Sequence, residues 1–355
     1  MITHELVNTE WFDATALRLP DYKVGRVNFG KGRSYIKIMD GGVLESPLKL
    51  YTSLTTAINS CAPMEDPLLE WYCKLGIAEA KRQTKIAQMY GTLMHLEIGK
   101  FLIEKVYDFD TTQSVTEQYL SDHNYWEPEC KEWALKLKYD MASFIQFSID
   151  YDLEPLGIEY VLLSEKGFGT LIDLVCNLTV EEQGHWGEVY KTGDKKGEAK
   201  LTKKAIRKRA IINFKSGRKG FYRSNGIQIE CERQLWEENF PDLPLDMAMN
   251  WAPNEWRDTP GYHIKDWVGD ICQEEVDAVL ALARVRYANK AERKEYLHIT
   301  GVVSSGESLA VALQRENIED FCSRKFSSTP ISKQTQKSTT KPIVKKEFKS
   351  QPLPI

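Results

Sequence analysis

The sequence lacks paired cysteines, a long apolar run and a strong excess of either charge. Its seven cysteines are scattered without a Cys-x-x-Cys pair, which argues against zinc ribbons and a disulfide framework and fits a reducing compartment. No basic region followed by an apolar run opens the sequence, and no stretch is long enough to span a bilayer. We therefore expect a soluble, cytoplasmic protein with no membrane partner.

The net charge of −4 excludes a protein that is basic throughout. A nucleic-acid-binding surface would have to be a local patch. With 355 residues and 42% apolar content, the chain can bury a large core. One large domain, or one domain with an appended lobe, is the expected organisation.

The pattern of the sequence predicts four segments. Short alternating runs broken by glycines indicate a β-rich or irregular lead-in over residues 1–45. Capping residues and apolar spacings of three or four indicate a helical lobe over residues 46–155. Apolar runs around glycine turns, alternating with helical patterns, indicate an α/β core over residues 156–322. Residues 323–355, rich in Ser, Thr, Lys and Pro, are expected to be a disordered basic tail.

Finer features refine these segments. Helices are expected to begin near Thr52 and Pro67 and to cover residues 78–105 and 128–151, with a hairpin formed by residues 157–165 and 170–178. A helical piece is expected at residues 308–321. The tail could tether nucleic acid, dock a partner through its last residues, or act only as a solubilising extension.

A short buried strand, Ala210 to Gly217, carries the most informative polar residues. Asn213 and Lys215 are two residues apart, so the alternation of a strand directs them to the same face. An oxygen ligand for a divalent cation beside an ammonium group is what phosphodiester hydrolysis requires. The alternative is a strand edge with a solvated lysine.

Two further polar residues stand in apolar surroundings. Asp173 lies in an otherwise apolar strand, where a buried carboxylate needs a cation, a hydrogen-bond donor or water. His95 lies among apolar residues of a predicted helix. A histidine in that setting is more often a core residue than a ligand, and only the motifs further along the chain favour the ligand.

A lysine-rich insert separates the two predicted strands of the core and continues beyond the second one. It is either a solvated surface or, beside a metal site, a surface that grips phosphates. The residues predicted to bind nucleic acid are Lys204, Arg207, Lys208, Arg209, Arg218, Lys219 and Arg223.

The candidate residues occur in a telling order: Gly-Thr-Leu-Met-His95 on a helix, Gly-Thr-Leu-Ile-Asp173 on a strand, Asn213-Phe-Lys215 on the next strand, and Gln228 on the helix after it. This order resembles the PD-(D/E)XK nuclease superfamily, in its RecB-like, phage-type exonuclease branch, over about residues 52–240. The resemblance implies an α/β, restriction-endonuclease-like core with a central mixed sheet flanked by helices.

The resemblance also implies roles for these residues. Mg²⁺ or Mn²⁺ would be held by His95, Asp173, the side-chain oxygen of Asn213 and the carbonyl of Phe214. Lys215 would be the catalytic lysine, and Gln228 would orient it or a DNA phosphate. Some branches also hold an iron–sulfur cluster, but the cysteines here lack its spacing, so none is expected.

Two positions depart from the family pattern. Asn213 stands where the family has a second metal-binding aspartate, and Glu232 stands where it has a tyrosine. We expect the second change to affect only packing or orientation. The first weakens the ligand set, because a neutral oxygen holds Mg²⁺ less well than a carboxylate.

Asn213 has three competing explanations. It could be an engineered replacement of an active-site aspartate, a natural variant rescued by Glu159 or Glu165, or the mark of a nuclease fold that binds DNA without cleaving it. The first is favoured, because the other catalytic positions are intact. The sequence thus predicts a metal-dependent DNA exonuclease of phage-type replication or recombination, impaired as given. The alternatives are a catalytically silent DNA-binding protein and a structure-specific endonuclease.

Overall fold

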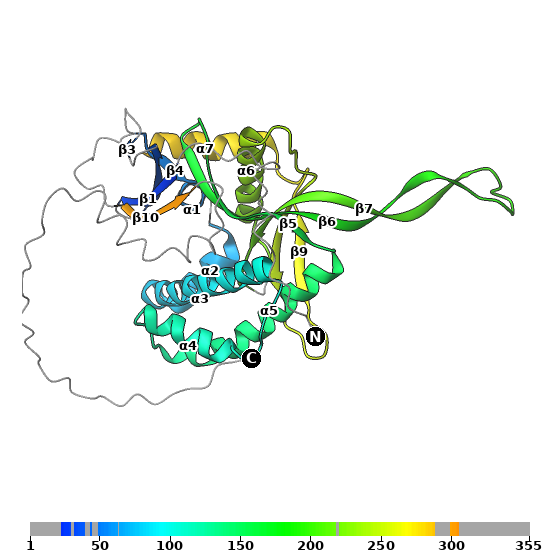
Figure 1. The fold of residues 1–355 in the computed structure, drawn as a ribbon. Coiled ribbons are helices and arrows are strands. Elements are labelled where there is room, and N and C mark those ends of the chain that lie inside the picture. Colours follow the sequence, from blue (N-terminus) through cyan, green and yellow to red (C-terminus); the bar gives the residue numbers. More distant parts are fainter. Residues whose placement is uncertain are drawn as a thin grey trace, which may run out of the picture.

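The computed structural model describes residues 23–29, 32–39, 43–44, 49–62, 64–217, 220–287 and 299–304. Within these residues a mixed sheet of ten strands carries helices on both faces (Figure 1). The predicted α/β architecture, a central mixed sheet flanked by helices, is therefore confirmed. The predicted helical piece at 308–321 and the tail at 323–355 lie outside the described residues.

The sheet has a main path of eight strands with two more at its sides. β4 and β6 are parallel, as are β7 and β8, and the other pairs are antiparallel. β3 (Val43–Leu44) pairs with β2, and β5 (Glu154–Leu163) pairs with β6. The path runs through β10 (Ile299–Ser304), β1 (Lys23–Phe29), β2 (Gly32–Met39), β4 (Tyr51–Ser53), β6 (Phe168–Val189), β7 (Ala199–Phe214), β8 (Met247–Pro253) and β9 (Tyr262–Asp266).

The helices largely follow the predicted periodicity. Two differences have physical reasons. The helix expected to begin near Thr52 starts two residues later, because Thr52 and Ser53 pair with neighbouring strands and belong to β4. The helix α4 (Thr112–Asp122) is not predicted, because threonines on its buried face conceal its amphipathic pattern. The described helices are α1 (Leu54–Cys61), α2 (Asp66–Leu75), α3 (Ile77–Glu104), α4 (Thr112–Asp122), the 3₁₀ helix η3 (Pro128–Glu132), α5 (Trp133–Asp150), α6 (Arg223–Asn239) and α7 (Gln273–Tyr287). None of them has the length and apolar character of a membrane span.

Two hydrophobic clusters attach the helices to opposite faces of the sheet. On one face α3 and α5 pack against β5 to β8, with Phe144 of α5 in edge contact with Phe214 of β7 and Trp251 of β8. On the other face α1, α6 and α7 cover the same strands, with Trp236 fully buried. The helices predicted as a lobe thus share a core with the strands; the domain boundaries stay a prediction.

The lysine-rich insert is not irregular. β6 and β7 continue beyond the sheet as a two-stranded ribbon that projects from the body of the molecule (Figure 1). Its outer part is paired from Glu181↔Ala205 to Val189↔Ala199, with a register shift after His185. Because solvent borders both faces there, the sequence shows none of the apolar alternation that signals a strand.

Candidate active site

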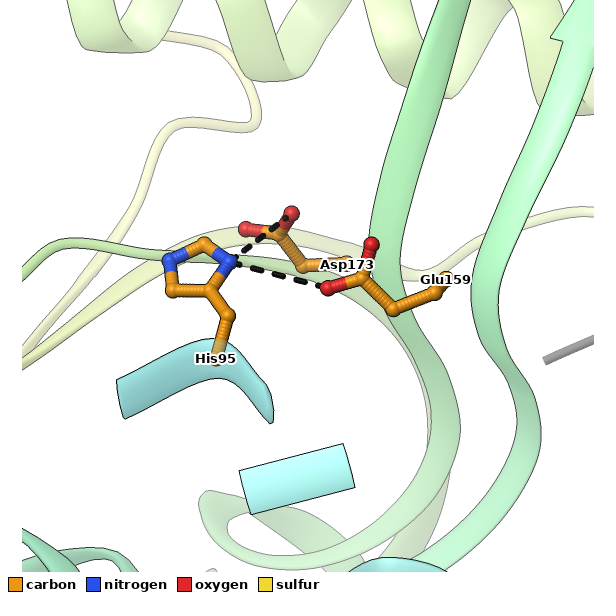
Figure 2. Close-up of side chains that lie close together, drawn as sticks. All are labelled: His95, Glu159 and Asp173. Atoms are coloured by element: carbon orange, nitrogen blue, oxygen red, sulfur yellow. Dashed lines mark ion pairs between the residues drawn. The ribbon is translucent and has the colours of Figure 1, made fainter. Parts of the chain in front are cut away.

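Three potential metal ligands converge from three elements. His95 of α3, Glu159 of β5 and Asp173 of β6 each offer one atom, and these atoms lie within 4.8 Å of one another. His95 Nδ1 is 3.6 Å from Glu159 Oε1 and 3.5 Å from Asp173 Oδ1 (Figure 2). Both carboxylates are buried, at 3% and 6% exposure. The sequence therefore identified two members of the cluster and named the third as a rescuing acid.

The glycine of the Gly-x-x-x-His motif lies where α3 passes close to the end of β7. Gly91 lies one turn before His95 on α3, and a Cβ there would be 3.4 Å from the Ser216 hydroxyl, an ordinary van der Waals distance. The space at this position would therefore admit a methyl group. The His95 ring packs edge-on against Phe214, with 5.5 Å between ring centroids. Helix α3 is held against the end of β7 by these contacts.

The glycine before Asp173, in contrast, answers a packing demand. A Cβ on Gly169 would lie 2.6 Å from Leu163 Cδ2 and 2.9 Å from Tyr35 Cδ2, so no side chain fits there. Further along β6, Asp173 Oδ2 accepts a hydrogen bond from the Phe214 backbone N–H at 2.7 Å. The partner demanded by the buried carboxylate is therefore on β7, and one carboxylate oxygen remains directed at His95.

Glu159 reaches the cluster through an unusual backbone conformation. The backbone φ angle of Glu159 is +53°. Its neighbours remain paired in the sheet, Ile158 with Leu174 and Tyr160 with Ile172. A left-handed conformation costs a non-glycine residue about 1–2 kcal/mol, and such residues concentrate at functional sites. The other suggested rescuing acid, Glu165, lies elsewhere. Its side chain is 80% exposed and it pairs with Lys37 and Lys49.

A chain of hydrogen bonds joins β7 to α6. Lys215 Nζ donates to Gln228 Oε1 at 3.1 Å, and Gln228 Nε2 donates to Glu232 Oε1 at 2.8 Å. Thr170 Oγ1 donates to the same carboxylate oxygen at 3.3 Å. Burial lowers the pKa of Lys215, and the charges of Asp173 and Glu232 oppose that shift only in part. The lysine predicted to be catalytic is thus hydrogen-bonded to Gln228, and the roles of both residues stay predictions.

Glu232, for which the sequence predicts an effect on packing or orientation only, contacts two of the candidate site residues. It is fully buried, and its carboxylate accepts hydrogen bonds from Asn213 Nδ2 at 3.3 and 3.5 Å. Burial, and then the charge of Asp173, raise the pKa of Glu232 to about 7. The sequence contained a sign of this position, because Glu232 follows Gln228 by one helical turn and therefore lies on the same face of the helix. The departure thus places a buried acid against Asn213 and Gln228, where its hydrogen bonds orient both side chains.

The electrostatics of the site favour a bound cation. Burial alone lowers the pKa of His95, but the charge of Asp173 and hydrogen bonds to Asp173 and Glu159 outweigh it and raise the pKa to about 10. Asn213 is 4% exposed, and its Oδ1 accepts no hydrogen bond from the residues that the structure describes. A buried acceptor without a donor costs about 1–3 kcal/mol. A metal ion would satisfy both features.

The remaining predicted residues lie outside this cluster. The metal-ligating role of the Phe214 carbonyl stays a prediction, since the observed contacts of Phe214 are its N–H and its ring. Most of the predicted nucleic-acid-binding residues engage the protein itself. Arg207 pairs with Asp152 and Glu154, Lys208 with Glu182 and Arg223 with Glu275, Arg209 donates to the Pro244 carbonyl, and Lys204 lies over the Trp186 ring. Arg218 and Lys219 are outside the described residues.

A separate cavity of about 570 Å³ lies between α5 and the loop after β8. Trp133, Lys136 and Trp256 are among the residues that line it, and none of the lining residues belongs to the cluster. The cavity therefore does not bear on the chemistry of His95, Glu159 and Asp173.

No protein-family model matches this chain, and a search of curated proteins finds no match either. The function of this chain is therefore inferred from its site geometry and from the order of its motifs.

Proposed function

We propose that this chain is a metal-dependent deoxyribonuclease that hydrolyses phosphodiester bonds from DNA ends, on a restriction-endonuclease-like core. The observation that carries the proposal is the convergence of His95, Glu159 and Asp173 beside the half-buried, hydrogen-bonded pair of Lys215 and Gln228. An imidazole, two carboxylates and an adjacent ammonium are the groups that phosphodiester hydrolysis with a divalent cation uses.

Two of the three distances between the ligand atoms suit one divalent ion. Two ligand atoms about 2.1 Å from the same ion lie about 3.0–3.6 Å apart for angles of 90° to 120° at the metal. His95 Nδ1 is 3.5 and 3.6 Å from the two carboxylate oxygens, which falls in that range. The acids suit Mg²⁺ and Mn²⁺, and the imidazole favours Mn²⁺. A bound ion would polarise the scissile phosphate and acidify an attacking water.

The protein's own groups have separable roles. Lys215 donates one hydrogen bond to Gln228. Its ammonium group is close enough to Asp173 for the two charges to interact. From there it orients a water molecule and offsets negative charge that develops on the phosphate. Gln228 is itself anchored on Glu232. These contacts keep the lysine in one position, so little reorganisation accompanies the reaction.

The projecting ribbon is the proposed contact for the DNA backbone. Its tip carries three exposed lysines, Lys191, Lys195 and Lys196, hereafter the ribbon-tip lysines. A two-stranded β-ribbon fits a DNA groove, and lysines on it would meet phosphates. Lys204 also lies there, over the half-exposed Trp186 ring at 5.5 Å.

Digestion of linear and covalently closed circular DNA tests the proposal. With Mg²⁺ or Mn²⁺ the chain should shorten linear DNA and spare circles. Lys215→Ala should lower the rate by about 10²- to 10³-fold, and Asp173→Asn should abolish metal-dependent cleavage. Lys265→Ala, a lysine paired with Asp270 outside the site, is the matched control and should retain activity.

Each alternative has its own outcome. DNA binding without digestion in any divalent metal would refute the enzyme and favour a catalytically silent DNA-binding protein. Cleavage of closed circles would favour an endonuclease. Activity that survives Lys215→Ala would refute the assigned role of the lysine.

A further inference from the structure

We propose that Asn213 and Glu232 act as one unit, in which Glu232 turns the Asn213 oxygen toward the metal site and supplies the negative charge that position 213 lacks. The unit comprises one amide on β7 and one carboxylate on α6, 3.3 Å apart at their closest atoms. This inference rests on the proposed function, since it concerns how the same site holds its cation.

The orientation of the Asn213 amide is set by Glu232. Nδ2 faces both carboxylate oxygens of Glu232, because a carboxylate accepts hydrogen bonds and cannot donate them. The other end of the amide, Oδ1, is buried and accepts no hydrogen bond from the described residues. The carboxylate therefore selects the amide orientation that leaves an oxygen available for a cation.

Glu232 is in turn fixed in place. Its Oε1 accepts hydrogen bonds from Gln228 at 2.8 Å and from Thr170 at 3.3 Å, and its side chain is completely buried. Donors from α6 and β6 thus hold the carboxylate against Asn213. Gln228 also accepts from Lys215, so one continuous chain of hydrogen bonds connects the proposed catalytic lysine to the Asn213 amide nitrogen.

The two departures from the family pattern then become one exchange. The strand position has an amide in place of an acid, and the helix position has gained an acid that contacts this amide. Relative to an aspartate and a tyrosine at these positions, the amide and the acid leave the net charge of the pair unchanged and keep one oxygen for the metal. An engineered replacement at position 213 would not account for an acid at position 232.

The exchange predicts the effect of Glu232→Gln. The introduced amide nitrogen would face Asn213 Nδ2, and two donors cannot satisfy each other. The Asn213 amide would turn so that Oδ1 accepts from the glutamine, and the ligand oxygen would be lost to the metal. Disrupting such a supporting contact weakens metal binding by about 10- to 100-fold. The double variant Asn213→Asp with Glu232→Gln should bind within a few-fold of the unaltered chain.

Calorimetric titration of the full chain with Mn²⁺ tests this independently of activity. The set comprises the unaltered chain, Glu232→Gln, the double variant and Asp173→Asn. Glu230→Gln is the matched control, since Glu230 is a buried acid on the same helix that pairs with Arg233 outside the site. We expect weakened binding for Glu232→Gln, recovery in the double variant and no change for Glu230→Gln.

The possible failures are distinguishable. If Asp173→Asn binds Mn²⁺ as tightly as the unaltered chain, the metal site and with it the proposed function are wrong. If Asp173→Asn loses the metal while Glu232→Gln keeps it, only the exchange is wrong. Weak binding by a folded double variant also overturns the exchange. Should Glu232→Gln fail to fold by circular dichroism, the double variant alone decides.

Discussion

The buried carboxyl of Glu232 should make the metal-free protein less stable as pH rises, and Glu232→Gln should remove that loss. Burial, then the charge of Asp173, raise the pKa of Glu232 from 4.5 to about 7 in the folded protein. The folded state therefore holds the proton more tightly than the unfolded state. Between pH 4.5 and 7 the free energy of unfolding falls as pH rises.

The size of the effect follows from the shift. About 2.5 pKa units at about 1.4 kcal/mol each amount to about 3 kcal/mol at pH 8. His95 also contributes, since its pKa is raised to about 10. The stabilisation from its imidazolium is fully present below pH 6.5 and is lost as pH rises through 10. Because His95 is present in both proteins, the difference between them isolates Glu232.

Urea unfolding in the presence of a chelator measures this difference. The stability of Glu232→Gln relative to the unaltered chain should increase by about 3 kcal/mol from pH 4.5 to pH 8. The value at pH 4.5 serves as the internal reference for changes in packing and hydrogen bonding. A difference that is flat across this range would refute the placement of an ionisable carboxyl in a dry site.

Three further predictions concern the cation, the ribbon and the core. Mn²⁺ binding at pH 8 should release a proton from His95, whose pKa is near 10 without metal; a titration heat independent of the buffer's ionisation enthalpy would contradict this. Alanine at the ribbon-tip lysines should weaken DNA binding and reduce the slope of log K against log salt by up to about 3, and an unchanged slope would exclude phosphate contacts. Gly169→Ala should lower the free energy of unfolding by about 1–3 kcal/mol through its clash with Leu163. Gly99→Ala is the control and should not destabilise the protein, because the nearest atom to its Cβ would be 3.8 Å away. Equal stability of the two variants in urea would contradict the packing around Gly169.

The parts of the fold that the sequence predicts are those whose burial follows a simple period. Helices α3 and α5 have apolar residues at spacings of three and four, and the β5–β6 hairpin has apolar runs around a glycine turn. The outer ribbon has solvent on both faces, so its strands are specified by cross-strand pairing and leave no period in the sequence. Helix α4 escapes notice because Thr112 and Thr116 occupy its buried face.

The candidate site divides along a similar line. His95, Asp173 and Lys215 belong to motifs within a few residues of a glycine or a buried strand, and such local patterns are legible. Glu159 was only a possible substitute ligand. Its inclusion depends on a left-handed backbone at that residue, which no local motif announces.

The pairing of Asn213 with Glu232 is a relation in space that position-by-position comparison with a motif cannot represent. Read separately, one residue is a lost ligand and the other an unexplained acid. Once α6 packs beside the end of β7, the two side chains lie 3.3 Å apart. In the proposed unit the amide would provide an oxygen and the acid would provide the charge. Two departures from the motif are thereby compatible with a metal site, because the physical requirement is for charge and oxygen at one point and not for an aspartate at one position.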